Sequence, residues 1–249
     1  MPISRDRILF EDEHLLAVHK LAGELTVRGS SLRRGYGRQE GERGKLPLYD
    51  FLHQDYPGLR VLHRLDFDTS GVLLFAKTKA AGEAVLASHF KGWKKVYRAI
   101  VSGVIDRDRG VIRALLPARG KFGKRNAEFG IDLKKNSSFR TPNSELIPAI
   151  THFEVLKRFH GATYVECEIE TGRHHQIRRH FAAIKHALAL DEIYGELKYN
   201  KAFGRATGFR KFFLHAASLT LPHPISGETI HVEAALPKVF EAVLKKLQS

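Results

Sequence analysis

The chain has 249 residues, with 41 lysines and arginines against 27 aspartates and glutamates, a formal net charge of +14 and a sequence pI near 9.9. This length allows one large domain or two small ones, each with its own hydrophobic core. The positive charge attracts polyanions and makes nucleic acid the first partner to consider, although a generally basic protein without such a partner has the same composition.

The cysteine content and the lack of long apolar runs exclude further classes. Cys167 is the single cysteine, which excludes an intrachain disulfide and a zinc site built from thiolates. Residues 1–7 lack an apolar signal core, and no run approaches the roughly 20 apolar residues that span a bilayer. We therefore expect a cytoplasmic protein.

The first predicted elements are short. Residues 8–20 predict two strands around an acidic turn, and residues 48–52 predict a short helix. Between them, residues 28–45 are basic, rich in glycine and almost without apolar side chains, so we expect a mobile loop. This loop is either an arm that orders on RNA, with Tyr36 stacking on a base, or a solvated loop without a role.

A polar segment directly before a buried strand is the strongest candidate site. The run Val72 to Ala76 is apolar throughout, which predicts a strand that is covered on both faces. Residues 63–71 precede it and therefore sit at the mouth of a rigid element. Arg64 stands two residues before Asp66 on the same side of an extended backbone, and its guanidinium favours the ionised carboxylate.

The next two elements are a helix and a strand. Thr78 is a suitable N-cap for a helix that runs to Phe90. Residues 94–102 then predict a strand that presents Tyr97 to one face and Val96 to the other. Spacing alone favours Tyr97 as a packing residue with a satisfied hydroxyl.

A second basic stretch and an alternating strand follow. Residues 119–140 form either a phosphate-contacting loop or a solvated surface excursion. Residues 163–170 alternate strictly between apolar and polar, which predicts a strand with one face in the core. Cys167 lies on the apolar face and is interpreted as a small buried hydrophobe.

A helix is predicted after Gly172, with an apolar stripe and with Arg178 at the edge of that stripe. The stripe consists of Ile177, Phe181 and Ile184. A dense basic patch near the N-terminal end of the helix suits anionic groups. It consists of Arg173, His174, His175, Arg179 and His180. We reject a metal site in this patch because it lacks a His-Glu-x-x-His spacing, a thiolate pair and a carboxylate ligand.

The last part of the chain predicts two strands and a helix. Residues 212–220 and 229–234 are the strands, joined by a turn over residues 222–227. Pro237 opens the final helix, whose packed face is formed by Val239, Phe240, Val243, Leu244 and Leu247. Short strands with a few helices and no regular strand-helix repeat predict an α+β fold with a largely antiparallel sheet.

Four motifs in order resemble those of the RluA-type pseudouridine synthases. Residues His63-Arg64-Leu65-Asp66-Phe67-Asp68-Thr69-Ser70-Gly71 match the pattern H-R-L-D-x-x-T-S-G, and Lys95-Val96-Tyr97-Arg98-Ala99 resembles the tyrosine motif. Thr171-Gly172-Arg173-His174-His175-Gln176-Ile177-Arg178 resembles T-G-R-x-H-Q-[IL]-R, and Leu214-His215-Ala216 with His223-Pro224 resembles the closing segment. Asp191-Glu192-Ile193-Tyr194-Gly195 also resembles the family's G-D-x-x-Y-G turn, with Leu190 in place of the first glycine.

The resemblance implies a fold and a domain organisation. It implies the pseudouridine synthase fold, a largely antiparallel mixed sheet with flanking helices and a central RNA-binding cleft. We expect residues 1–249 to form a single catalytic domain that acts as a monomer. We expect no separate N-terminal RNA-binding module, so the basic loops 28–45 and 119–140 belong to this domain.

The resemblance also implies a reaction, the isomerisation of uridine to pseudouridine within RNA, without a cofactor or a metal. Asp66 is then the essential carboxylate, which adds to the base, attacks the sugar or takes a sugar proton. Tyr97 stacks on the uracil and takes the proton from carbon 5, and Arg178 pairs with Asp66.

Further residues are expected to bind the RNA. Arg64 is expected to fill the space of the flipped uridine, because its planar guanidinium stacks like a base. His63 and Thr69 are expected to shape the loop, and Leu214 to form an apolar wall near the uracil. The remaining expected contacts come from Arg173, His175 and Gln176.

The RNA and two competing functions stay open at this point. The segment Gln176 to His180, with Tyr194-Gly195 and Asn200, resembles the TruC-type tRNA-modifying branch, so tRNA is favoured over ribosomal RNA. A glycosidase needs two carboxylates, and Asp68 lies about 7 Å along an extended chain from Asp66, which is possible but not indicated. A non-catalytic RNA-binding or chaperone protein would not need Asp66, Tyr97 and Arg178 together.

Overall fold

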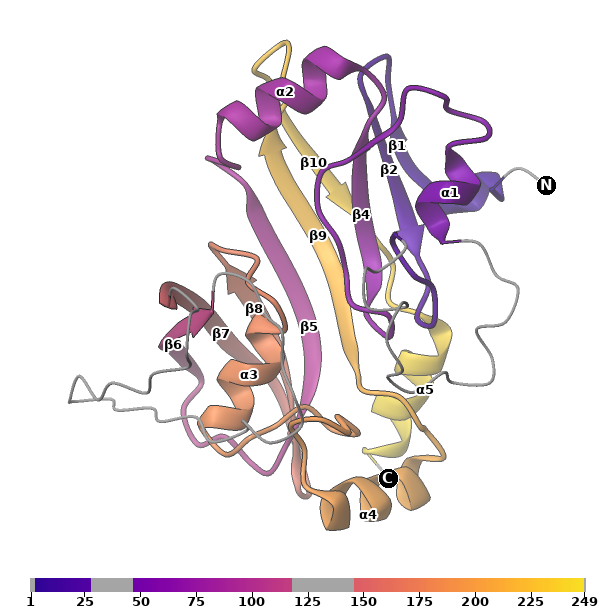
Figure 1. The fold of residues 1–249 in the computed structure, drawn as a ribbon. Coiled ribbons are helices and arrows are strands. Elements are labelled where there is room, and N and C mark those ends of the chain that lie inside the picture. Colours follow the sequence, from indigo (N-terminus) through magenta and orange to yellow (C-terminus); the bar gives the residue numbers. More distant parts are fainter. Residues whose placement is uncertain (1–2, 28–46, 118–145, 249) are drawn as a thin grey trace, which may run out of the picture. The chain divides into compact units, whose positions relative to one another are not determined.

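The computed structural model describes residues 3–27, 47–117 and 146–248 (Figure 1). The chain divides into two compact units. Unit 1 comprises Met1–Trp93 and Ala216–Ala235, and unit 2 comprises Lys94–His215 and Leu236–Ser249. The two predicted basic loops, 28–45 and 119–140, lie outside the described residues. The single catalytic domain stays a prediction.

Unit 1 is built on a sheet in which β1, β2, β4 and β9 are successive neighbours, with β3 beside β4 and β10 beside β9. The strands are β1 (Ile8–Glu11), β2 (Leu15–Lys20), β3 (Arg60–Val61), β4 (Ser70–Ala76), β9 (Leu214–Pro222) and β10 (Thr229–Glu233). The pairs β1–β2, β2–β4, β3–β4 and β9–β10 are antiparallel. The short 3-10 helix η1 (Arg5–Arg7) and the helices α1 (Leu48–Leu52) and α2 (Lys79–Ala87) complete the unit.

Strand β4 is the centre of unit 1. All seven of its residues are buried, as its continuous apolar sequence predicts. Thr78 caps α2 as predicted, because its hydroxyl accepts a hydrogen bond from the amide of Ala81 at 3.3 Å. The helix ends at Ala87, earlier than the predicted Phe90, because His89 and Phe90 have left-handed φ angles of 50° and 61°.

Unit 2 contains a second run of antiparallel strands, in the order β5, β8, β7, β6. These strands are β5 (Lys94–Ser102), β6 (Arg109–Pro117), β7 (Leu146–Phe159) and β8 (Ala162–Ile169). The predicted alternation of β8 is confirmed, since Val165, Cys167 and Ile169 are buried while the residues between them are partly exposed. Burial in an apolar environment raises the pKa of the Cys167 thiol, as expected for a packing residue.

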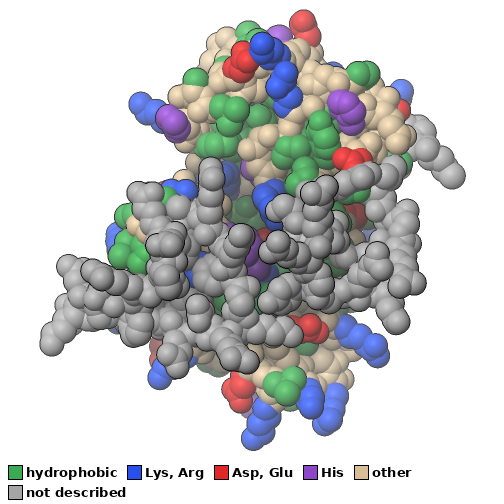
Figure 2. Space-filling model, in the orientation of Figure 1, with side chains coloured by type: hydrophobic (Ala, Val, Ile, Leu, Met, Phe, Trp, Pro, Cys, Tyr) green, Lys and Arg blue, Asp and Glu red, His purple; other side chains and the backbone are tan. Residues whose placement is uncertain are grey.

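The helices that the structure describes in unit 2 are α3 (Gln176–Ala183), α4 (Leu197–Thr207) and α5 (Lys238–Lys246). Helix α3 packs against β6 and β7 (Figure 1). Helices α4 and α5 share an aromatic core, in which the stacked rings of Phe213 and Phe240 lie 3.9 Å apart. Figure 2 shows Lys and Arg side chains gathered over α4.

The prediction that Val239 belongs to the packed face of the final helix is wrong. Val239 is 52% exposed, whereas Phe240 and Val243 are buried. Val239 stands in the first turn, beyond the edge of the buried stripe. The strands and helices otherwise confirm the α+β fold. In the described part of the chain, no helix is long and apolar enough to cross a membrane.

Candidate active site

Asp66 lies in a turn that unit 1 holds on both sides. The amide of Thr69 donates a hydrogen bond to the carbonyl of Asp66 at 3.1 Å and closes the turn. Just before it, Leu65 is fixed by the buried hydroxyl of Thr26, which accepts from the Leu65 amide at 3.3 Å and donates to the Leu65 carbonyl at 3.2 Å. The backbone around Asp66 is therefore fixed, while its side chain is partly exposed.

A buried cation, the ammonium group of Lys20, holds this turn by hydrogen bonds to its backbone. Lys20, at the end of β2, is 0% exposed, and its Nζ donates to three backbone carbonyls. These belong to Leu21 at 3.1 Å, Phe67 at 3.0 Å and Thr69 at 2.7 Å. A buried ammonium needs such acceptors, and each carbonyl needs a donor once water is excluded. Lys20 thus ties strand β2 to the segment that carries Asp66, a role that the sequence analysis did not assign.

Gly71 brings the same segment against β9. Its φ angle is +115°, and a Cβ atom at this position would lie 2.1 Å from the carbonyl oxygen of Ala216. Only glycine fits such a close approach of two backbones. The glycine of the T-S-G motif is therefore required by packing in unit 1.

The other predicted residues of this segment differ in exposure. His63 Nε2 accepts a hydrogen bond from the amide of Leu74 at 3.0 Å, and the imidazole meets the Trp93 ring edge-on at 5.7 Å. Thr69 is buried, and the expected role of both residues in shaping the loop stays a prediction. Arg64 is exposed, so a ligand can reach its side chain. Its contact with RNA stays a prediction.

Tyr97 and Lys95 lie on the same face of β5 in unit 2. Tyr97 is 9% exposed and stands opposite Cys167 in the register of β5 and β8. Lys95 precedes it by two residues, and burial lowers the pKa of its ammonium to about 8. Its Nζ lies 3.5 Å from the position that a Cβ atom on Gly172 would occupy, beside the predicted T-G-R motif. Lys95 was not predicted to share a face with Tyr97, although the period of two along a strand indicates it.

Arg178 is held by a buried carboxylate. Its Nε donates to Asp191 Oδ2 at 2.6 Å and its Nη2 donates to Oδ1 at 2.9 Å. Arg178 is 4% exposed and Asp191 is 0% exposed. The guanidinium carbon also lies over the rings of Tyr194 and Phe212, at 5.2 and 4.4 Å from their centroids. These contacts fix the plane of the guanidinium.

The turn after α3 supplies this carboxylate. Asp191 Oδ1 also accepts the amides of Ile193 and Tyr194, at 2.9 and 3.1 Å. The side chain of Asn200 bonds to both the Leu190 amide and the Asp191 carbonyl, at 2.9 Å in each case. The sequence analysis noted this turn by its resemblance but did not predict that Asp191 pairs with Arg178.

Gln176 and His175 organise the start of α3. The Gln176 side chain is buried, its Oε1 accepting from the Thr171 hydroxyl and its Nε2 donating to the Ile150 carbonyl, at 2.7 and 2.8 Å. His175 has a left-handed φ of 52°, and its Nδ1 lies 3.1 Å from the Tyr194 hydroxyl. These hydrogen bonds of Gln176 and His175 are made within the protein. The predicted contacts of the two residues with RNA stay untested.

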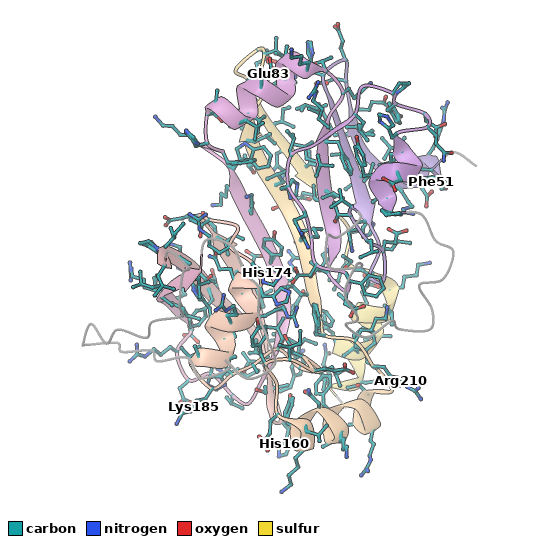
Figure 3. The ribbon with its side chains drawn as sticks, in the orientation of Figure 1. Phe51, Glu83, His160, His174, Lys185 and Arg210 are labelled. Atoms are coloured by element: carbon teal, nitrogen blue, oxygen red, sulfur yellow. The ribbon has the colours of Figure 1, made fainter. Side chains whose placement is uncertain are left out.

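The predicted basic patch is smaller than expected. Arg179 and His180 are buried, so the expectation that they face an anion is wrong. Burial, with a smaller contribution from Arg179, lowers the pKa of His180 to about 4, and its Nδ1 lies 2.9 Å from the Thr151 hydroxyl oxygen. The partly exposed members are Arg173, His174 and His175. Figure 3 shows His174 at the start of α3.

The described side chains offer acid–base and charge chemistry. Unit 1 presents the carboxylate of Asp66, and unit 2 presents the phenol of Tyr97, the guanidinium of Arg178 and the apolar side chain of Leu214, which is buried at the start of β9. Within residues 3–27, 47–117 and 146–248, no group of three or more His, Cys, Asp or Glu side chains is placed to hold a metal ion.

Comparisons with known proteins identify the family. The family model described as RNA pseudouridylate synthase matches residues 14–183. Ribosomal large subunit pseudouridine synthase C of Escherichia coli K12 is 35% identical over 247 residues, which are 98% of this chain and 70% of that protein. The protein of the same name from Yersinia pestis is 36% identical over 245 residues, covering 98% of this chain and 69% of that protein.

Two solved structures share the fold. The human RNA pseudouridylate synthase domain containing 4 has a TM-score of 0.71 at 23% identity, with 98% of this chain and 93% of that chain covered. The human RNA pseudouridylate synthase domain containing 1 has a TM-score of 0.68 at 24% identity, with 97% and 90% covered. These likenesses confirm the predicted pseudouridine synthase fold. The family match over residues 14–183 and the relatives at 35 and 36% identity show that the chain belongs to the RluA-type pseudouridine synthases, isomerases that act on uridine in RNA.

Proposed function

We propose that this chain isomerises a specific uridine in structured RNA and that Asp66 is the essential carboxylate. The observation that carries the proposal is the turn at Asp66. Its backbone is fixed by Lys20 and Thr26, while Asp66 as a residue is partly exposed. A catalytic group needs this combination of a rigid support and access to the substrate.

The reaction balances without an added reactant. The bond between the sugar carbon C1′ and the base nitrogen N1 breaks, the uracil turns over, and carbon C5 forms a new bond to C1′. The proton on C5 is lost and N1 gains one, so no atoms are exchanged with a cofactor. Asp66 takes part by adding to the base, by attacking C1′ or by removing a sugar proton, and each of these roles needs an ionised carboxylate.

Tyr97 and Arg178 complete the proposed catalytic set. Tyr97 stacks on the uracil and takes the proton from C5, and Arg178 pairs with Asp66. Asp191 holds Nε and Nη2 of Arg178, which fixes the guanidinium within unit 2. The fixed guanidinium then orients the carboxylate and favours its ionised form.

The target uridine leaves the RNA stack in this proposal. Arg64 fills the vacated space, which its exposure allows, and offsets part of the stacking energy lost on flipping. Leu214 forms an apolar wall for the flipped base. Arg173 and His175 contact the neighbouring phosphates, since both are partly exposed.

Two RNA pools are candidates for the substrate. The printed names of the relatives, ribosomal large subunit pseudouridine synthase C, favour ribosomal RNA, and these relatives align with 98% of this chain. The resemblance of residues 176–180, with Tyr194-Gly195, to the TruC-type branch favours tRNA. We place ribosomal RNA of the large subunit first and tRNA second.

A tritium-release assay tests the proposal. The protein is incubated separately with large-subunit ribosomal RNA and with bulk tRNA, both labelled at uracil C5 and free of modification. Release from the ribosomal pool alone supports our first choice, and release from tRNA alone supports the second. Absence of release from both pools contradicts the proposed activity on these RNAs.

A further inference from the structure

Helix α4 carries a row of three cations on its solvent face. Lys198, Lys201 and Arg205 follow one another at spacings of three and four residues, which places them on one side of a helix. All three side chains are exposed, while Phe203 and Thr207 are buried on the opposite side. The row spans about 10 Å along the helix axis.

The neighbours of this row leave it accessible. Ala202 and Ala206 are the other exposed residues of the helix after Lys201, and both are small. Figure 2 shows the Lys and Arg side chains projecting from this part of unit 2. Leu197, which precedes Lys198, is also exposed, at 69%, so the two alanines leave a polyanion open access to the C-terminal half of the row.

These cations also lack acidic partners. Some exposed cations of unit 2 are paired across the strands, as Lys94 is with Glu168 and Arg109 is with Glu154, each at 2.9 Å. Among the residues that the structure describes, no ion pair involves a cation of the α4 row. The eleven residues of α4 include no Asp or Glu.

Helix stability does not account for the whole row. A cation in the last turn, such as Arg205, interacts favourably with the helix dipole. Lys198 stands in the first turn, where the dipole disfavours a positive charge. The exposed N-cap residue Glu196 is the acidic residue at this end of the helix, and it forms no ion pair with Lys198 among the described residues.

The surroundings favour double-stranded over single-stranded RNA. Sites for single strands combine cations with exposed aromatic rings on which bases stack. The aromatic side chain nearest the row in sequence, Tyr199, instead stacks on Phe203 at 5.8 Å between ring centroids, on the inner side of the helix. Contacts made by cations alone suit the phosphate backbone of a duplex, which is recognised by shape and charge.

We propose that Lys198, Lys201 and Arg205 form a docking surface for the phosphate backbone of double-helical RNA. The inference rests on the proposed RNA substrate, whose folded parts are duplex. Its role is to hold the RNA through a helical region, independently of the nucleotide that is modified.

The test compares two triple variants with equal loss of charge. In the first, Lys198, Lys201 and Arg205 are replaced by Gln. In the control, the exposed residues Lys91, Arg107 and Lys157 are replaced by Gln. The probe is an RNA duplex of about 20 base pairs without a loop, long enough to present successive grooves. Its affinity is measured by fluorescence anisotropy between about 50 and 200 mM salt.

The α4 variant is expected to bind the duplex about tenfold more weakly at the lower salt and to reduce the slope of log K against log salt by about 2 to 3. The single variant Lys201→Gln is expected to reduce the slope of log K against log salt by about 1. This variant keeps the proposal testable if the triple variant does not fold. If the affinity and slope of the α4 variant equal those of the control, the proposal is wrong. Binding of anionic phospholipid vesicles by the row, with unchanged duplex affinity, also overturns it.

Tritium release separates this inference from the proposed function. Wild-type protein that releases no tritium while the α4 variant loses duplex affinity contradicts the enzymatic proposal and supports the docking surface. Normal release with unchanged duplex affinity of the α4 variant supports the enzyme and refutes the docking surface. Asp66→Asn is expected to bind the duplex as the wild type does.

Discussion

Arg178 and Asp191 form a buried, two-pronged ion pair in which Nε and Nη2 donate to the two carboxylate oxygens at 2.6 and 2.9 Å. The guanidinium is therefore fixed by its own unit before any RNA is bound. In the proposed mechanism Arg178 pairs with Asp66, so the activity also depends on Asp191, which holds the guanidinium.

Replacing Asp191 by Asn is expected to destabilise the protein by about 3 kcal/mol, because Arg178 is left as a buried cation without its partner. Denaturant unfolding measures this loss. Glu192→Gln removes the same charge at the exposed neighbouring position and serves as the control. Equal unfolding midpoints for the two variants would show that the Arg178–Asp191 ion pair contributes nothing to the stability of the protein. At a temperature where Asp191→Asn is folded, we expect its tritium release to fall mainly through kcat.

Replacing Lys20 by Met is expected to lower the free energy of unfolding by about 3 kcal/mol, because one buried and two partly buried carbonyls lose their donor. Lys94→Met, which removes an exposed ion pair with Glu168, is the control and should cost less than about 1 kcal/mol. Urea unfolding compares the two. A Lys20 variant no less stable than the control contradicts the supporting role that we assign to this lysine.

Gly71→Ala is expected to destabilise the protein by about 3 kcal/mol, because the added Cβ overlaps the Ala216 carbonyl and the φ angle is unfavourable. Gly227→Ala isolates the backbone effect. Its φ angle is +78° but nothing lies within 4 Å of the added Cβ, so we expect about 1 kcal/mol. Thermal melting distinguishes the two; similar shifts for both would refute the close approach of β4 and β9.

His180 is expected to make stability depend on pH. Its pKa is about 4 in the folded protein against 6.5 as the ordinary value, so the unfolded state binds more protons between these limits. Stability is therefore fully retained above pH 6.5 and falls as the pH drops towards 4. His180→Gln should remove up to about 3 kcal/mol of this pH-dependent loss.

The control for this experiment is His160→Gln, at an exposed position that Figure 3 labels. Unfolding by urea at a series of pH values gives the slopes. The wild type, His180→Gln and His160→Gln are compared by the free energy of unfolding that each loses between neutral and acidic pH. If all three lose the same amount, burial of a neutral His180 is not the cause of the pH dependence.

Local sequence patterns predicted the elements in which every residue is buried and those in which buried and partly exposed residues alternate. Continuous apolar residues identified β4, and the period of two identified β8 with Cys167 inside. A threonine directly before a helical pattern identified the start of α2. In each case the signal is contained in neighbouring residues, so tertiary contacts were not needed to interpret it.

Other features depend on contacts distant in sequence. Helix α4 was not predicted, since Asn200 and Gly204 are weak helix formers and its buried face is defined by α5. The burial of Arg179 and His180 was missed because charged residues are assumed to face solvent unless the structure shows a cover. Asp191 pairs with Arg178 across a turn whose geometry the substitution of Leu190 left undetermined, and Leu190 there adopts a left-handed φ of 66°.

Tritium release by Asp66→Asn tests the central claim most directly. The substitution keeps the size of the side chain and removes its charge, and binding of the same labelled RNA shows whether the variant is folded and competent to bind. We expect RNA affinity within a few-fold of the wild type and no release of tritium from the RNA that the wild type modifies. An Asp66→Asn protein that releases tritium at the wild-type rate would contradict the assignment of Asp66 as the essential carboxylate.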